Sequence, residues 1–241
     1  MVHLHDTNHD ELWEYVSDLG ILGTGKQGME ILFRPSPVLG AWIAWIEEGL
    51  VERGWGRGRV LDVGCGSGRD LGFLVSRDFE WFVSGVDNWT KAVERAEVMV
   101  KSIHPERLEG IFNVEIDENS GLILSSSSSN SRNVNQKVTQ NVKELFRQRF
   151  KLLLIIRFFP RAFFRYVHEF VDQGGYLIFS HFTDPPTGEK DYVSPSREKR
   201  VRVGEVETLL SEGYKGWEIL QGAYSRTEDG RALWDVVARK G

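Results

Sequence analysis

The sequence predicts an α/β fold, a doubly wound and mostly parallel seven-stranded sheet with an antiparallel C-terminal strand. Segments with strand and helix patterns alternate through most of the chain, as in parallel sheets with helical crossovers. Segment 150–156, FKLLLII, is almost continuously apolar, as expected of a strand buried on both faces. Turn residues at 227–230, TEDG, separate the last two strands and indicate an antiparallel hairpin.

The individual elements follow from hydrophobic spacing and from turn and cap residues. Ser36 and Pro37 suit the cap and first position of a helix over 36–53. A glycine pair at 174–175 predicts a turn between a helix and a strand. The remaining helices are predicted over 10–19, 68–77, 90–103, 161–171 and 203–210. The strands are predicted over 59–63, 81–86, 110–116, 150–156, 176–182, 217–220 and 232–239.

Chain length and local composition divide the sequence into two predicted parts. The 241 residues suit one α/β domain with additions. We assign 1–57 to a helical lead-in and 58–241 to the main domain. The region near 119–141 holds five consecutive serines and little core material, so it is predicted to be a low-complexity insertion.

Composition and charge exclude several classes of protein. The formal charge of -5 and the pI of about 5.8 disfavour nucleic acid as the main partner. The single cysteine, Cys65, rules out an intrachain disulfide and a cysteine metal site, and no metal site is expected. The N-terminus lacks an apolar signal region and no run suits a membrane span, so we expect a soluble, cytoplasmic protein. The oligomeric state stays open.

A glycine loop follows the first predicted strand of the sheet, in the segment VLDVGCGSGRD at 60–70. Ligands of doubly wound sheets bind at the carboxyl ends of strands, so this loop is a candidate site. Its G-x-G-x-G spacing differs from the dinucleotide fingerprint G-x-G-x-x-G. A second segment, GILGTGKQ at 20–27, approaches the phosphate-binding P-loop, but Gln27 cannot supply the Mg²⁺-binding hydroxyl. We interpret that segment as a flexible connector.

The residues VLDVGCGSG at 60–68 resemble motif I of class I S-adenosylmethionine-dependent methyltransferases, which have a Rossmann-like fold. The resemblance implies S-adenosylmethionine as the cofactor, with Asp62 ordering the loop and attracting the cofactor's ammonium group. It also implies that Asp87 binds the ribose hydroxyls and that Asp117 binds the adenine amine. The implied cofactor-binding residues are Asp62, Gly64, Cys65, Gly66, Ser67, Gly68, Asp87, Asn88 and Asp117.

The later segment RFFPRAFFRYVHEFVDQGGYLIFSHF at 157–182 resembles the small-molecule methyltransferases of the tellurite-resistance type. This resemblance implies methyl transfer to a small acceptor, such as a thiol, a chalcogen oxyanion or another anion. Two alternatives stay open. The acceptor is instead a macromolecule, tRNA or protein, or the chain is a catalytically inactive binding or scaffold protein.

Few residues suit the acceptor side of such a site. Arg157 and Arg161 follow the fourth strand and suit an anionic acceptor. A surface salt bridge or a snorkelling side chain explains Arg157 equally well and is the favoured interpretation of Arg161. His181 is a candidate base, with a packed histidine as the alternative. Phe158, Phe159, Phe163 and Phe164 are candidates for an apolar pocket, at least half of them being expected in the core. The basic run REKR at 197–200 is interpreted as a solvated loop.

Overall fold

The structure, a computed structural model, describes residues 34–121, 123–125, 145 and 147–241. The predicted helix over 10–19, the P-loop-like segment 20–27 and most of the serine-rich insertion lie outside the described residues.

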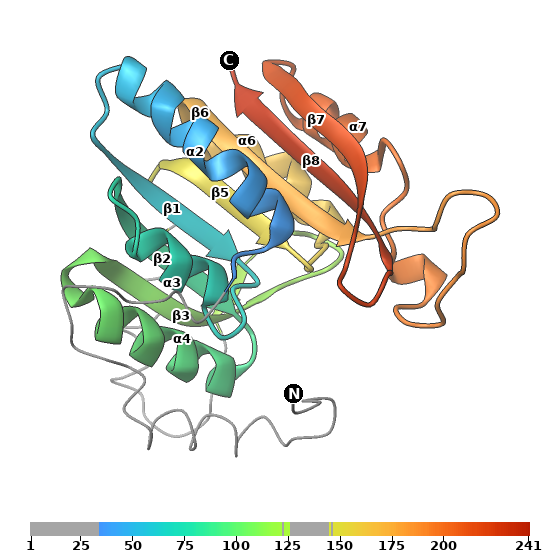
Figure 1. Ribbon diagram of the computed structural model, residues 1–241, viewed down its shortest axis with the longest axis horizontal. Helices are drawn as coiled ribbons and strands as arrows, with labels where there is room; N and C mark the ends of the chain where they lie inside the picture. Colours follow the sequence, from blue (N-terminus) through green and yellow to red (C-terminus); the bar gives the residue numbers. More distant parts are fainter. Residues whose placement is uncertain (1–33, 122, 126–144, 146) are drawn as a thin grey trace.

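A single eight-stranded sheet forms the centre of the described chain, in the order β4-β3-β2-β1-β5-β6-β8-β7 (Figure 1). All seven predicted strands are present. The strands are β1 (Arg57–Val63), β2 (Glu80–Asp87), β3 (Leu108–Ile116), β4 (Ile123–Ser125), β5 (Phe150–Ile156), β6 (Val171–Phe182), β7 (Trp217–Arg226) and β8 (Ala232–Lys240). The additional strand, β4, pairs antiparallel with β3 at the sheet edge, inside the region assigned to the insertion. The pairing of β8 antiparallel to β6 confirms the predicted C-terminal strand.

Helices cover both faces of this sheet and bury two hydrophobic clusters (Figure 1). The first face carries α2 (Pro37–Glu52), α3 (Arg69–Val75) and α4 (Thr90–Ile103). The second face carries the 3₁₀ segment η2 (Arg161–Tyr166), α6 (Val167–Phe170) and α7 (Glu205–Gly213). Short 3₁₀ turns η1 (Pro105–Arg107) and η3 (Arg197–Lys199) complete the elements. Alternate strand side chains enter the two clusters, as the pleat requires.

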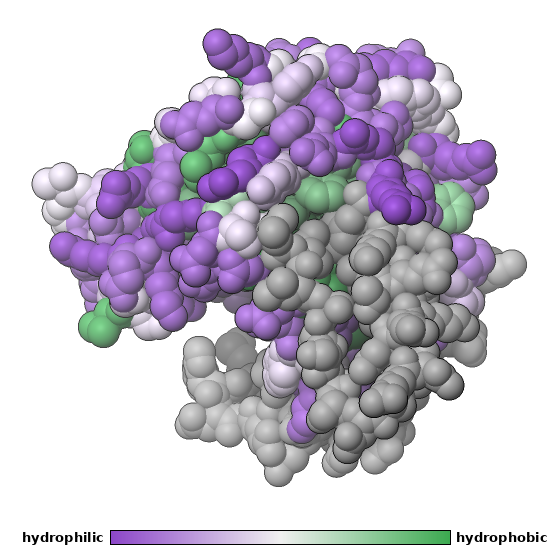
Figure 2. All heavy atoms as spheres, turned by 180° about the vertical axis from the view of Figure 1, so that it is seen from behind, coloured by the Kyte–Doolittle hydropathy of each residue, from purple (hydrophilic) through white to green (hydrophobic). Residues whose placement is uncertain are grey.

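The opposite side of the molecule is shown in Figure 2, where the described surface is mostly hydrophilic. Among the described residues, no helix has both the length and the apolar composition that a membrane crossing requires.

The segment before the sheet is packed into the sheet's own core. Ile43 and Ile46 of α2 are buried in the first cluster. Glu47 accepts two 2.6 Å hydrogen bonds from Arg77 and one of 2.8 Å from the Trp81 indole. Helix α2 therefore belongs to the same core as the sheet. The division of the chain at residue 57 stays a prediction.

Two predicted elements around β6 have a different form. The helix expected over 161–171 consists of η2 followed by the four-residue α6. The turn expected at the glycine pair is instead a bulge inside β6. The register between β5 and β6 shifts there, because Phe150 pairs with Val171 whereas Leu152 pairs with Tyr176. Gly174 has φ +71, a left-handed conformation that glycine adopts without strain, so the strand continues through the bulge.

The sheet order places its switch point between β1 and β5. The chain adds β2 and β3 on one side of β1, and then β5 and β6 on the other side. The loops that leave β1 and β5 therefore diverge to opposite sides and leave a crevice at the carboxyl ends of these strands.

Candidate functional site

The glycine loop leaves β1 at this crevice, and its backbone needs glycine at three positions. Gly64, Gly66 and Gly68 have φ values of +82, +53 and +81. This left-handed region costs other residues about 1–2 kcal/mol each. A Cβ on Gly68 would lie 2.8 Å from the Ala96 Cβ, so glycine lets the loop pack directly on α4. A Cβ on Gly66 would meet nothing within 4 Å, which leaves this part of the loop open to a ligand.

Asp87 fastens the glycine loop to the end of β2. Its Oδ2 accepts a hydrogen bond from the Gly66 N–H at 2.9 Å, and its Oδ1 accepts one from the Trp89 N–H at 2.9 Å. A carboxylate oxygen accepts more than one hydrogen bond, so both oxygens keep capacity for donors from a ligand.

Asp62 lies buried at the end of β1, beneath the loop. Burial raises the pKa of its carboxyl well above the usual value, and the nearby carboxylates of Asp70 and Asp87 raise it further, against the opposing charge of Arg69. A cationic group beside the loop would favour the ionised form of Asp62. The electrostatics here suit a ligand that carries positive charge.

A cavity of about 360 Å³ opens beside the loop. Gly64, Asp87, Asn88 and Asp117 line it together with Phe158, the second residue after β5. Asp117 Oδ1 accepts 2.7 Å hydrogen bonds from the backbone N–H and the hydroxyl of Ser120, which lower the pKa of the Asp117 carboxyl. Glu115, Glu118 and Asn119 also line the cavity, so its walls combine four acidic residues and two asparagines with one aromatic residue.

A second cavity, of about 420 Å³, adjoins the first. Glu118, Asn119 and Phe158 line both cavities. The second cavity is completed by Arg157, Phe159, Arg161, His181, Glu198 and Lys199. Phe158 stands against the glycine loop, since a Cβ on Gly64 would be 2.7 Å from the Phe158 Cβ. The two cavities meet at this ring.

His181 of β6 is held as a neutral side chain. Its Nε2 lies 3.0 Å from the Lys199 carbonyl oxygen, a contact in which the nitrogen must donate. Burial lowers the pKa of the imidazole to about 4, and the charges of Arg161 and Arg157 add to the effect. The other ring nitrogen, Nδ1, is buried and has no hydrogen-bond partner among the described residues. This geometry indicates that His181 is a packed side chain that holds the Lys199 backbone in place. It does not favour a role as a proton-accepting base.

The comparisons with known proteins bear on this arrangement. No protein-family model matches the chain. The chain is 29% identical over 245 residues to uncharacterized protein UNK4.09 of Schizosaccharomyces pombe, a match that covers 95% of this chain and 70% of the relative. Magnesium protoporphyrin IX methyltransferase (ChlM) from Synechocystis, solved with bound SAH, has a TM-score of 0.54 and 13% identity, over 97% of this chain and 95% of its own. TehB from Haemophilus influenzae has a TM-score of 0.53 and 15% identity, over 82% of this chain and 62% of its own.

The chain has the class I methyltransferase fold. At these identities the likeness concerns the fold alone, because one fold carries many activities. Within the methyltransferase fold, the glycine loop, Asp87 and Asp117 lie at the carboxyl ends of β1, β2 and β3, as the motif resemblance predicted.

The predicted cofactor residues occupy two positions relative to the first cavity. Gly64, Asp87, Asn88 and Asp117 line the cavity wall. The others lie in or beneath the loop: Asp62, Cys65, Gly66, Ser67 and Gly68. The Cys65 thiol is part of the first hydrophobic cluster and packs toward Gly85, and burial raises its pKa well above the usual value. A buried thiol of this kind is unreactive, so Cys65 serves the loop as a small packing residue rather than as a nucleophile.

The four phenylalanines after β5 divide evenly, as predicted. Phe158 and Phe159 line the second cavity, whereas Phe163 and Phe164 are buried in the second hydrophobic cluster. Arg161 lines the cavity but is engaged in a salt bridge, donating to Glu205 at 2.7 Å, the structural alternative considered for it.

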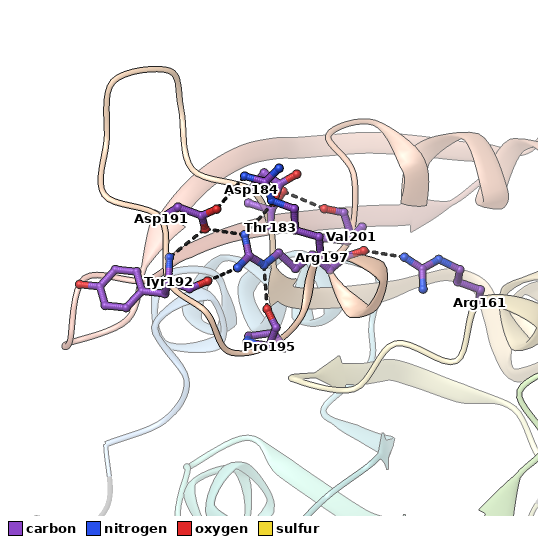
Figure 3. A network of polar contacts seen from close by, with 9 residues as sticks. Arg161, Thr183, Asp184, Asp191, Tyr192, Pro195, Arg197 and Val201 are labelled. Carbon is purple, nitrogen blue, oxygen red and sulfur yellow. Dashed lines mark hydrogen bonds and ion pairs between the residues drawn. The ribbon is translucent and has the colours of Figure 1, made fainter.

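A loop over 183–200 walls the second cavity, and sequence analysis missed how it is built (Figure 3). The interpretation of 197–200 as a solvated run is wrong for Arg200, which is 5% exposed. The Arg200 guanidinium donates to backbone and carboxylate acceptors on the loop, namely the carbonyls of Tyr192 and Pro195 and the side chains of Asp184 and Asp191. Arg161 donates to the Arg200 carbonyl at 2.5 Å, which joins the loop to η2.

Other cavity residues that the sequence analysis missed are Glu118, Asn119, Glu198 and Lys199. Glu118 and Asn119 follow a strand end, so the rule that found Asp87 and Asp117 could have found them. The remaining two depend on the fold of the 183–200 loop. Within the described part of the chain, no group of three or more His, Cys, Asp and Glu side chains is placed to hold a metal ion.

Proposed function

We propose that the protein is an S-adenosylmethionine-dependent methyltransferase that acts on a small-molecule acceptor. The observation that carries the proposal is the left-handed glycine loop, fastened by Asp87 and placed beside a cavity at the carboxyl ends of the strands. Within the methyltransferase fold, the crevice at the switch point is the expected ligand site.

The residues of the first cavity fit this cofactor chemically. The open backbone at Gly66 lets an extended ligand approach the loop closely. Asp87 has lone pairs left for two ribose hydroxyls. Asp117 and Asn88 supply an ionised acceptor and an amide for an adenine edge. Buried Asp62 favours a nearby positive charge, and this cofactor carries an ammonium and a sulfonium group.

The bound cofactor would supply an electrophilic methyl group on its sulfonium. The chain's own contribution is to align an acceptor with that group and to exclude water. Phe158, at the junction of the cavities, is placed to separate the cofactor side from the acceptor side. The neutral His181 side chain keeps Lys199 and the 183–200 loop in position. At neutral pH its one N–H proton is already engaged in the hydrogen bond to the Lys199 carbonyl.

The dimensions of the second cavity favour a small acceptor over a macromolecule. Its volume of about 420 Å³ lies within the usual range for small-molecule pockets. One wall is the 183–200 loop, which Arg200 braces from within. A braced wall restricts access for a folded nucleic acid or protein.

Calorimetric titration tests the cofactor. The wild type should bind S-adenosylmethionine and S-adenosylhomocysteine but neither NAD nor ATP. Asp87→Ala should weaken binding at least tenfold, about 1.4 kcal/mol. Asp87→Asn, which keeps one acceptor oxygen for the loop, should give a smaller loss. Asp78 is an exposed acid that precedes the start of β2, at the opposite end of that strand from Asp87. Asp78→Ala is therefore the matched control and should bind as the wild type does.

Folded wild type that binds neither compound would contradict the proposal. The acceptor class is tested with labelled S-adenosylmethionine incubated with a small-molecule panel, tRNA or a protein extract. Label recovered in macromolecules would overturn the small-molecule assignment. Absence of transfer with cofactor binding intact would favour the inactive binding protein.

A further inference from the structure

Arg157 differs from the other arginines at the carboxyl edge of the sheet. Its guanidinium forms no ion pair or hydrogen bond with any residue in the described part of the chain. Its neighbours are each paired with a carboxylate: Arg161 with Glu205 at 2.7 Å, Arg231 with Asp229 at 2.9 Å and Arg69 with Asp70 at 3.4 Å. Arg157 is therefore the cation in this group that lacks a carboxylate counterion.

The backbone of Arg157 is held in an unfavourable conformation at the cavity. Its φ of +60 is the only positive value at a non-glycine residue among those described. The left-handed conformation costs about 1–2 kcal/mol for such a residue. The Arg157 N–H donates to the Ser180 carbonyl at 2.7 Å, so the surrounding strands fix this conformation. Strain of this kind concentrates at functional sites.

The surroundings of the guanidinium are cationic and aromatic. Its Cζ lies 5.1 Å from the centre of the Phe182 ring, and the Arg231 Cζ lies 4.6 Å from the same ring. Partial burial lowers the pKa of Arg157, and the charges of Arg69 and Arg231 lower it further, more than Asp229 and Asp70 restore it. Arginine nevertheless stays charged in proteins, so an anion at this point would relieve the repulsion.

The size of the cavity bears on which kind of anion would bind. Arg157, Phe158 and Phe159 contribute to a space of about 420 Å³. An inorganic oxyanion fills only the space of a few waters, at about 30 Å³ each. The lining glutamates are Glu118 and Glu198, and Glu198 already accepts a hydrogen bond from the Ser196 hydroxyl. An organic anion with an apolar body matches both the charge and the aromatic walls.

We propose that Arg157 binds the carboxylate of an organic acid that is the methyl acceptor, with the acid's apolar body against Phe158 and Phe159. The assignment of this acid as acceptor rests on the proposed methyltransferase function. The planar guanidinium suits a carboxylate through two parallel hydrogen bonds, which lysine cannot form.

Matched pairs of acids and amides test the proposal. The protein, with and without saturating S-adenosylhomocysteine, is titrated with benzoate and benzamide, phenylacetate and phenylacetamide, and hexanoate and hexanamide, with selenite as an inorganic oxyanion. Each acid that binds should do so at least tenfold more tightly than its amide. Arg157→Gln should abolish this preference, and Arg157→Lys should retain part of it. Arg231→Gln removes a charge that is already paired with Asp229, and it should leave the preference intact.

Three results would overturn the proposal. They are amides that bind as tightly as acids, a preference that survives Arg157→Gln, and selenite that binds more tightly than every organic acid. If the preference survives and Arg157→Gln also binds S-adenosylhomocysteine more weakly, Arg157 is assigned to the cofactor's own carboxylate instead. Failure of S-adenosylhomocysteine to bind the wild type, with acid binding still dependent on Arg157, would remove the methyltransferase function and leave the anion site standing. Thermal unfolding of each variant establishes that it is folded.

Discussion

The two ends of the sheet differ in how their charges are matched. At the amino end, Arg59 pairs with Glu109 at 2.7 Å and Lys151 with Asp172 at 2.9 Å. At the carboxyl end, Asp62 and Arg157 have no ion-pair partner among the residues that the structure describes.

This difference favours the carboxyl end of the sheet as the ligand site. Paired surface charges contribute little to stability and cost little. A buried or crowded charge without a partner costs free energy, which a counterion recovers or, at a carboxyl group, a bound proton removes. The carboxyl end therefore favours a cationic ligand group near Asp62 and an anionic one near Arg157. At the amino end, the charges of the Arg59–Glu109 and Lys151–Asp172 pairs already neutralise each other. Four predictions test this contrast.

Gly68→Ala should have the largest effect. The alanine would have to adopt φ +81, a conformation that is unfavourable for it. Its Cβ would lie 2.8 Å from the Ala96 Cβ and 2.9 Å from the Ala96 Cα, so the glycine loop and α4 must separate. We expect the free energy of unfolding, measured in urea, to fall by about 4 kcal/mol, from backbone strain plus overpacking. Gly56→Ala, just before β1 at the amino end, meets nothing within 4 Å and should change stability by no more than about 0.5 kcal/mol. Equal effects at both ends would contradict the contrast.

The glycine loop was predictable because its constraints are local. A strand, an acid and alternate glycines are contiguous in sequence, and Asp87 follows from the rule that ligand residues stand at strand ends. The bulge at Gly174 and the short strand β4 were missed, because pairing partners rather than local pattern decide them. The burial of Arg200 was missed for a similar reason, since its acceptors meet only when residues 184–195 fold around it. The isolation of Arg157 could not be predicted either, because it depends on which neighbours take the carboxylates.

Acidification should destabilise the wild type through His181. The unfolded imidazole binds a proton below a pKa of about 6.5, whereas the folded one does so only near a pKa of about 4. Between these values the unfolded state binds more protons, so stability is full above pH 6.5 and falls as the pH drops toward 4. Over this window the wild type should lose up to roughly 3 kcal/mol more than His181→Gln, which keeps a donor for the Lys199 carbonyl but does not titrate. Urea unfolding at stepped pH measures the difference, and parallel profiles would refute it.

Asp62→Asn should separate stability from binding. The pKa of the Asp62 carboxyl is raised in the folded state. The protonated carboxyl therefore contributes stability that is fully present below the unfolded-state pKa and is lost as the pH rises through the folded-state pKa. The variant without cofactor should therefore be more stable than the wild type at pH 7, by a margin that shrinks in acid. Its affinity for S-adenosylmethionine should fall about tenfold, or 1.4 kcal/mol. Calorimetry and urea unfolding give the two readouts, with Asp78→Asn as control. A variant that is less stable and binds normally would assign Asp62 to packing alone.

Lys151→Met should have the smallest effect and tests the amino end. Lys151 pairs with Asp172 and its Nζ lies 3.2 Å from the centre of the Trp55 ring, with both charged side chains only partly exposed. The methionine fills the same space without charge, so we expect a loss of about 1 kcal/mol in urea unfolding. Lys101→Met, at the more exposed pair with Glu97, should lose less than about 0.5 kcal/mol. Neither variant should change the affinity for S-adenosylmethionine, because neither lysine lies at the carboxyl end of the strands. A change in that affinity with Lys151→Met would mean that the two ends are coupled through β5, and that the charge pairing at the amino end also serves the site.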